Sequence, residues 1–211
     1  MEGLIGKKIG MTQVWNEKGQ LVPVTVIEAG PCPVVQVKTK TTDGYDAVQL
    51  GFSEQKPQRL TKAARTRFEK ANVAAQRVLK EFAPDAGEEI KAGDAVGVGI
   101  FEGVTYVDVT GVSKGRGFSG VVRKFRFRGG PMTHGGHSKR RPGAMATRDL
   151  PGWIQKGKKM PGHMGAVQRK ARNLTVVQVR KDDNLLLVQG SIPGANGEIV
   201  IVKKALKKVK A

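Results

Sequence analysis

The sequence predicts a mainly β protein, built as a closed barrel or a sandwich, with a short helical segment and a long, basic, irregular extension inserted between strands. Two observations lead to this fold class. Short Val- and Ile-rich runs alternate with turn residues over most of the 211 residues. By contrast, residues 111–165 contain 13 glycines, and their apolar residues follow neither the strand period nor the helix period.

The predicted strands are short apolar runs bounded by Gly, Pro, Asp or Asn. An opening strand is expected in GKKIGMTQVW, and pairs such as Asp43-Gly44 and Asn196-Gly197 supply turns between later strands. The other runs are 22–30, 33–38, 45–52, 104–111, 173–180, 184–190 and 198–204.

One segment, residues 60–82, is predicted to be helical because its apolar residues recur at spacings of mostly three or four. Residues 78–82 are equally consistent with the start of a strand. The apolar positions of this helical pattern are Ala63, Ala64, Phe68, Ala71, Ala75 and Leu79.

Positive charge is distributed unevenly along the chain. Residues 1–110 hold 14 Lys and Arg against 14 acids, residues 111–172 hold 16 against the single acid Asp149, and residues 173–211 hold 7 against 3. We therefore predict a globular β-barrel domain from residues 1–110 and 166–211, and an extended basic loop from residues 111–165. Such a loop buries too little apolar surface to fold alone, so a polyanion such as RNA is expected to order it.

The same composition argues against membrane and disulfide classes. No apolar run reaches the roughly 18 residues of a spanning helix, and the N-terminus lacks the apolar core of a signal peptide. We expect a soluble, cytoplasmic protein. The one cysteine, Cys32, excludes an internal disulfide and is expected to be a small buried apolar residue.

Two glycine motifs in the basic segment are similar to nucleotide-binding loops, but each is incomplete. The G-x-G-x-x-G at 115–120 requires a following helix and an acid about 20 residues later, and we expect neither. The P-loop-like 152–159 ends in Lys159 instead of the hydroxyl that binds magnesium, and MPGHMG does not begin a helix. We expect these glycines to form turns that approach phosphate closely.

The histidines are interpreted as phosphate or base contacts. His134 and His137 have H-x-x-H spacing, but no Cys, Asp or Glu lies near enough in sequence to complete a metal site. Asp149 is the only acid in the segment, so a nucleophile–histidine–carboxylate set is excluded as well. The sequence thus predicts no catalytic residue, metal or cofactor.

The aromatic residues separate into two groups. Trp15 follows the opening strand and is expected to pack in the core, whereas Trp153 lies in a Gly- and Lys-rich segment and is expected to stack on a base or enter an RNA crevice. The phenylalanines alternate with cations, which fits either RNA contact or an extended strand with one apolar face. These are Phe118, Phe125 and Phe127.

Several long blocks, in order along the chain, are similar to one known family. They are GLIGKKIGMTQVW, DVTGVSKGRGFSGVVRKFRF, THGGHSKRRPG, KGKKMPGHMG and NLLLVQGSIPGANG. On these blocks the chain resembles the family of bacterial large-subunit ribosomal protein L-three. The resemblance implies a translation-factor-type β-barrel, and a basic extension at 114–165 that enters ribosomal RNA (rRNA) and approaches the peptidyl transferase centre. It also implies early binding near the 3′ end of the large rRNA, nucleation of subunit assembly, and neighbouring proteins L-fourteen, L-nineteen and L-seventeen.

Carried onto this sequence, the charge pattern and the resemblance together predict a set of rRNA-binding residues in the extension, with its tip at about 143–153. Many relatives have Gly-Gln at the tip, with a glutamine that is methylated in some, whereas this chain has Ala146 and Thr147, so that modification is expected to be absent. The predicted rRNA-binding residues are Lys114, Arg116, Arg123, Lys124, Arg126, Arg128, His134, His137, Lys139, Arg140, Arg141, Arg148, Trp153, Lys156, Lys158, Lys159 and His163.

Two alternative functions remain open at this point. A non-ribosomal or chromatin-like protein would bind duplex DNA as strongly as structured RNA. A nucleotide-dependent enzyme built on a translation-type barrel would turn over ATP or GTP, but the incomplete P-loop and the shortage of acids disfavour it.

Overall fold

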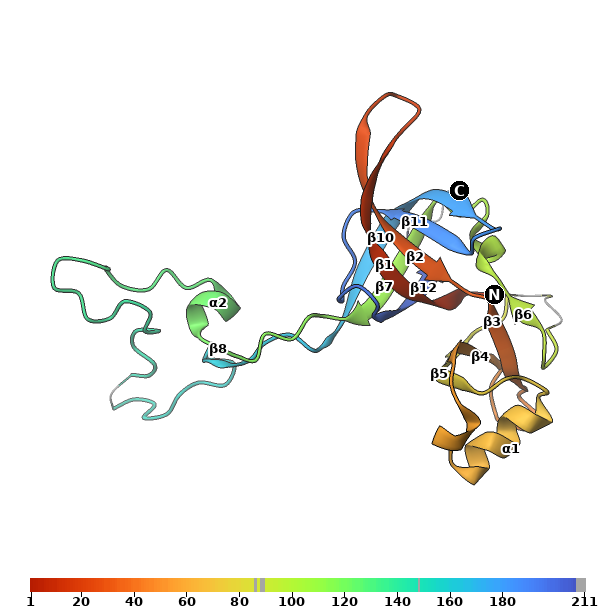
Figure 1. Cartoon of the computed structure of the whole chain (residues 1–211). Helices are drawn as coiled ribbons and strands as arrows, with labels where there is room; N and C mark the ends of the chain where they lie inside the picture. The colour runs from red at the N-terminus through yellow and green to blue at the C-terminus, as the bar shows by residue number, and fades with distance from the viewer. Residues whose placement is uncertain (86, 88–89, 148, 208–211) are drawn as a thin grey trace. The chain divides into compact units, whose positions relative to one another are not determined.

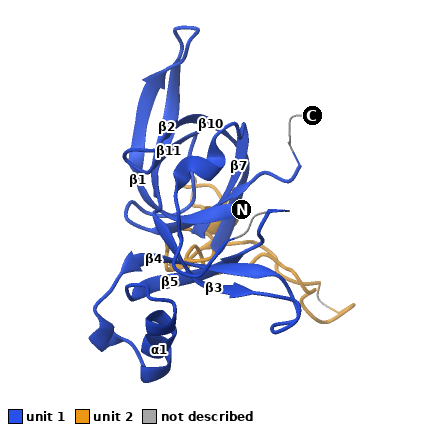
Figure 2. Cartoon of the chain, turned by 90° about the vertical axis from the view of Figure 1, so that its right-hand side faces the viewer, with its two compact units in different colours: residues 1–112, 168–211 blue, residues 113–167 orange. Residues whose placement is uncertain are grey.

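The computed structural model describes residues 1–85, 87, 90–147 and 149–207. The chain divides into two compact units (Figure 2): unit 1 comprises residues 1–112 and 168–211, and unit 2 comprises residues 113–167. Strands predominate and helices are few, which confirms the predicted mainly β class. In the described part of the chain, no helix has the length and apolar character needed to cross a membrane.

Six strands of unit 1 form a closed barrel, in the order β1-β12-β7-β10-β11-β2 (Figure 1). Every neighbouring pair is antiparallel, so each strand has a partner on both sides and the ring leaves no free edge. The strands are β1 (Gly3–Trp15), β2 (Leu21–Ala29), β7 (Tyr106–Val112), β10 (Gln168–Arg180), β11 (Leu185–Gln189) and β12 (Ile199–Lys204).

Side-chain alternation along these strands fills the barrel. Val200 and Val202 of β12 are fully buried, while their neighbours Ile199 and Ile201 are half-buried. Apolar side chains from the other strands join them in one core, and β1 and β11 also bury consecutive residues. These include Leu4, Ile5, Ile27, Val107, Val109, Leu186 and Val188.

A second sheet in unit 1 has the strand order β5-β4-β3-β6, and helix α1 (Lys62–Lys70) follows the short helix η1 (Pro57–Arg59). Phe68 is the buried residue of α1, and it packs with Val35 and Leu79 of the sheet. The strands are β3 (Cys32–Lys38), β4 (Ala47–Glu54), β5 (Gln76–Phe82) and β6 (Ala95–Val96), and helix η2 (Val98–Phe101) follows β6.

The prediction of a helix over 60–82 was wrong in its extent. The helix ends at Lys70, where Ala71 caps it and Asn72 adopts a positive φ of 51°. Residues 76–82 form β5, which pairs with β4 from Gln76 to Phe82 and confirms the alternative of a strand over 78–82. The apolar pattern misled because Ala75 is buried in the same small cluster as Phe68 and the half-buried Leu79 packs against it, although both lie beyond the helix.

The prediction that Trp15 packs in the core was also wrong, since its side chain is 69% exposed. β1 pairs with β12 only over residues 3–7, whereas its pairing with β2 continues to Trp15 opposite Leu21. The β1–β2 hairpin therefore extends beyond the barrel (Figure 1), where no further strand covers Trp15.

Two buried polar side chains tie separate segments of unit 1 together. Cys32 is buried as predicted, its thiol donates to the Ile5 carbonyl at 3.3 Å, and burial raises its pKa to about 12. Lys8 is 6% exposed, and its Nζ donates to the carbonyls of Ile192 and Gly194, each at 3.1 Å. Lys8 thus satisfies carbonyls in the 190–197 loop that are remote from it in sequence.

A buried carboxylate stabilises the irregularity where β7 pairs with β10. The register shifts between Ala171 and Leu174, and Asn173 adopts a positive φ there. Asp108 accepts hydrogen bonds from the Asn173 backbone N–H and from Lys170 Nζ, both at 2.8 Å. Burial acts to raise the pKa of Asp108, but these hydrogen bonds outweigh it and hold the pKa below the ordinary value of 3.8.

We expect Asp108→Asn to lower the free energy of unfolding at pH 7 by about 1–3 kcal/mol, because it removes a charge-assisted hydrogen bond. A carboxyl whose folded pKa is depressed stabilises the fold above its unfolded pKa, and the contribution is lost as pH falls through the folded pKa. The difference between wild type and variant should therefore shrink below about pH 4. Denaturant unfolding at several pH values measures it, and an equal difference at pH 7 and pH 2.5 would contradict this account.

Candidate nucleic-acid interface

The two ends of unit 2 run antiparallel and are joined by backbone hydrogen bonds. Ser113 N–H donates to the Val167 carbonyl at 2.9 Å, and Arg116 N–H donates to the Met164 carbonyl at 2.8 Å. Beyond them the two-residue strands β8 (Phe118–Ser119) and β9 (Gly162–His163) pair. These bonds form a short ladder at the base of the unit, through which the chain leaves and re-enters unit 1.

Glycine permits close backbone approach at two points in this unit. Gly165 has a φ of 79°, and a Cβ there would collide with the Lys114 carbonyl across the ladder. Gly129 has a φ of 77°, and a Cβ there would collide with the Lys139 carbonyl. At both points a side chain is excluded by backbone conformation as well as by space.

Between the ladder strands, residues 126–147 and 149–161 contain no strand or helix and are organised by isolated turns. Gly130 N–H donates to the Lys139 carbonyl at 3.0 Å, and Arg141 N–H donates to the Ser138 carbonyl at 2.8 Å. With so few internal hydrogen bonds, most backbone groups of this segment remain available to water or to a ligand.

The charge of unit 2 is almost entirely of one sign: it holds 13 Lys and Arg and the single acid Asp149. Of the predicted rRNA-binding residues, Arg148 lies outside the described residues, and all the others are exposed except Lys124, which is half-buried. Among the described residues, none of the predicted Lys and Arg side chains takes part in an ion pair. The cations are therefore free to meet an external anion.

The phenylalanines of this unit do not form the extended strand that was one interpretation of their alternation. Residues 121–125 form the short helix α2 (Val121–Phe125), with Arg126 at its C-cap in the left-handed conformation. The centroids of the Phe125 and Phe127 rings lie 6.3 Å apart, and the ammonium groups of Lys124 and Lys159 lie 5.2 and 5.9 Å from the Phe125 centroid. Phe125 thus positions cations, whereas Phe118 is 81% exposed.

Helix α2 also overturns the expectation that no helix follows the glycines at 115–120. It has five residues, and the sequence about 20 positions later, HSKRRPG, contains no acid that would bind a ribose. No helix follows the P-loop-like 152–159 in the described residues. The first segment therefore has a short helix but no acid for a ribose, and the second has no following helix, so neither matches a complete nucleotide-binding motif.

Trp153 is 67% exposed and lines a hollow of about 300 Å³. Thr147 donates from its hydroxyl to the Leu150 carbonyl at 2.6 Å and so closes a local turn. An exposed indole beside a small hollow is a surface on which a flat ring can stack. The other residues that line the hollow are Ala144, Met145, Ala146, Pro151, Gln155 and Lys158.

The histidines are placed in different parts of the unit. His163 lies on β9 opposite Phe118, whereas His134 and His137 lie in the irregular segment, with His134 at a φ of 54°. In the described residues there is no group of three or more His, Cys, Asp or Glu side chains that would hold a metal ion.

A second concentration of positive charge, at residues 56–80, was missed by the sequence analysis. It contains eight Lys and Arg and one acid, Glu69. The sum over residues 1–110 is zero because acids elsewhere in that half cancel it. A charge count in windows of about 25 residues finds it.

The chain is similar in sequence to known proteins over most of its length. The family model "Ribosomal protein L3" matches residues 75–185, which is more than half of the chain. The chain belongs to the ribosomal protein L3 family. Large ribosomal subunit protein uL3 of Deinococcus radiodurans is 47% identical over 211 residues, covering 98% of this chain and 96% of the relative.

Other bacterial relatives match this chain with similar identity and over nearly their whole length. The uL3 protein of Brachyspira hyodysenteriae is 44% identical, and the match covers 99% of this chain and 96% of the relative. The uL3 protein of Solibacter usitatus is 47% identical, and the match covers 96% of this chain and 98% of the relative. Membership places the L3-family chain in the large ribosomal subunit, and hence in translation and in the cytoplasm.

We expect Gly165→Ala to weaken the ladder at the base of unit 2 in this L3-family chain, because its Cβ would collide with the Lys114 carbonyl. Amide hydrogen exchange at Arg116 and Met164 should accelerate by at least about tenfold, while exchange in the barrel strands stays unchanged. Gly143→Ala is the matched control, since Gly143 also has a positive φ but nothing lies within 4 Å of its Cβ position. Equal effects of both substitutions would show that conformational strain, rather than the collision, is responsible.

Proposed function

We propose that this chain is a non-enzymatic structural constituent of the large subunit that binds large-subunit rRNA through unit 2. The observation that supports this most directly is the set of exposed Lys and Arg side chains in unit 2, which have no ion-pair partner among the described residues. Unpaired cations at this density repel one another, and rRNA phosphates relieve that repulsion.

The binding free energy comes largely from release of the counterions that surround RNA. If about six to ten of the cations meet phosphates, affinity falls by about 10³–10⁵ between 50 and 200 mM salt. The phosphate contacts position the unit, while Trp153 and the histidines add contacts to bases and to RNA shape.

Each part of the chain has a separate role in this proposal. Unit 1 is a translation-factor-type barrel that folds independently and anchors the protein at the subunit surface. Unit 2 is the extension that enters rRNA, with the segment around 143–153 reaching toward the peptidyl transferase centre. Binding occurs early, near the 3′ end of the large rRNA, and nucleates assembly. The protein neighbours are L-fourteen, L-nineteen and L-seventeen.

The proposal predicts that the protein in a cell lysate sediments with large subunits and whole ribosomes. Sucrose-gradient fractionation followed by immunodetection tests it, with a wash in moderate and high salt to separate loosely bound protein. Recovery mainly as free protein, or with DNA, would refute the proposal. Turnover of ATP or GTP by the purified chain would instead support the enzyme alternative.

We expect Arg140→Glu combined with Arg141→Glu to weaken binding to a large-subunit rRNA transcript by at least about tenfold at 150 mM salt and to impair subunit assembly. The melting temperature of the free protein should change by less than about 2 °C, because both residues are exposed and lie outside unit 1. The control is Lys18→Glu with Arg180→Glu, which makes the same change of charge at exposed sites of unit 1. A large drop in melting temperature for the unit 2 pair would contradict this division of roles.

A further inference from the structure

Residues 56–80 gather a strong positive charge on η1, α1 and β5 of unit 1. Eight Lys and Arg face one acid, Glu69, which gives a net charge of +7 over 25 residues. All eight side chains are exposed. We call this group of cations the α1 surface, although Arg77 and Lys80 lie on opposite faces of β5; they are Lys56, Arg59, Lys62, Arg65, Arg67, Lys70, Arg77 and Lys80.

Several other cations of unit 1 have an acidic partner, although Lys7, Lys18 and Arg169, for example, have none among the described residues. Lys38 pairs with Glu81 at 2.7 Å, and Lys203 pairs with Glu2 at 3.0 Å. None of the eight cations of the α1 surface has an ion pair within the described residues. Cations that only stabilise a fold are normally balanced nearby, so an unbalanced group indicates an external anion.

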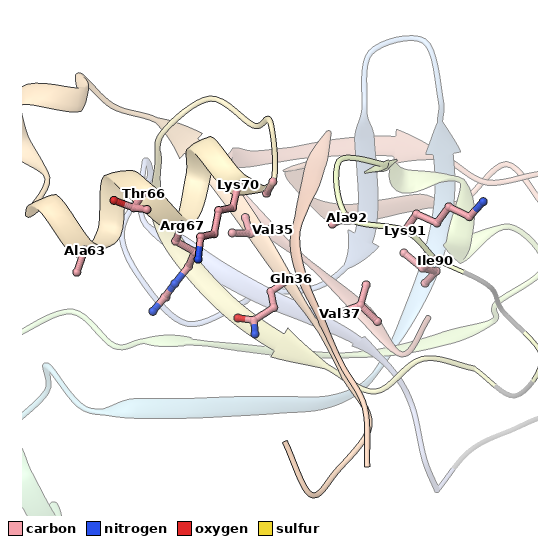
Figure 3. A pocket seen from close by; sticks show the side chains of 11 residues that line it. Val35, Gln36, Val37, Ala63, Thr66, Arg67, Lys70, Ile90, Lys91 and Ala92 are labelled. Carbon is pink, nitrogen blue, oxygen red and sulfur yellow. The ribbon is translucent and has the colours of Figure 1, made fainter. Parts of the chain in front are cut away.

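A groove lies between α1 and residues 90–92, next to the α1 surface (Figure 3). Arg67 and Lys70 project from α1 on one side, Lys91 lies on the other side, and β3 runs between them. The groove has a volume of about 680 Å³, and none of the described side chains that line it is acidic. Its apolar lining consists of Val35, Val37, Ala63, Ala71, Ile90 and Ala92.

The composition of the groove suits a nucleotide. The Arg67 guanidinium is a flat group on which a base can stack, the valines of β3 provide an apolar floor, and Lys70 and Lys91 are placed at the walls for phosphates. Gln36, half-buried on the floor, has a side-chain amide that can donate to or accept from a base edge.

We propose that the α1 surface is a second RNA-binding surface, in unit 1, which binds a stretch of RNA other than the one bound by unit 2. The α1–β3 groove holds an unpaired nucleotide, and the surrounding cations contact the phosphates on either side. This inference rests on the proposed function, since the RNA is taken to be large-subunit rRNA. An acidic protein segment is the competing partner, but it would engage the three groove cations and leave the cations on η1 and β5 without a role.

The test compares charge-reversed pairs in the full-length protein. Arg67→Glu with Lys70→Glu alters the α1 surface, Arg140→Glu with Arg141→Glu alters unit 2, and Lys18→Glu with Arg180→Glu is the control with the same change of charge. Affinity for a large-subunit rRNA transcript is measured by filter binding from 50 to 300 mM salt. Circular dichroism melting verifies that each variant is folded.

We expect the α1 pair to weaken binding by at least about tenfold at 150 mM salt and to reduce the slope of log affinity against log salt by about 2. The control pair should change the affinity by less than about threefold. Hydroxyl-radical cleavage from an iron chelate attached at a Thr66→Cys site, in a Cys32→Ala background, should cut rRNA at positions that a chelate at Ser138→Cys does not.

The outcomes separate this inference from the proposed function. If the unit 2 pair weakens binding and the α1 pair behaves as the control does, the second surface is refuted and the proposed function stands. If neither pair weakens binding, both are refuted. Binding of polyglutamate that the α1 pair abolishes, with rRNA affinity unchanged, would assign the groove to an acidic protein instead.

Discussion

Repulsion among positive charges is the constraint on which the arrangement of this chain depends. In unit 2, 13 Lys and Arg face a single acid, and no packed core of ordinary size accommodates that imbalance. The unit is accordingly built from a short ladder at its base, one helical turn and a series of glycine-supported turns. Its side chains remain exposed, and its backbone bonds are few, because the interactions that would complete its structure are expected from outside the protein.

In unit 1, by contrast, the charged groups that lie close to the core have partners within the protein. Asp108 is buried at the β7–β10 irregularity and pairs with Lys170, while Lys8 directs its ammonium group to two backbone carbonyls. These interactions join segments far apart in sequence and support a barrel whose strands leave no free edge. The α1 surface, whose cations have no ion pair within the described residues, departs from this balance and is proposed as a binding surface.

Much of the fold was predictable because period and turn chemistry act locally. The seven apolar runs correspond to β2, β3, β4, β7, β10, β11 and β12, each shifted at its ends by a few residues. The extent of the helix in 60–82 was mispredicted because Ala75 and Leu79 pack against the helix through tertiary contacts and do not lie on it. Trp15 was mispredicted because burial depends on what covers a strand, and the β1–β2 hairpin extends past its neighbours.

The sequence by itself determined the mainly β class, the position of the basic segment and the family, since all three depend on residue types and their order. It also predicted that the cations of unit 2 are exposed, because charged side chains remain in water unless they are paired. Only the tertiary structure decided which cations are balanced, since Lys170 and Lys38 lie far in sequence from the acids they meet. It also brought α1 alongside β3 to form the groove, a juxtaposition that arises from packing around Phe68 and is not encoded in any local pattern.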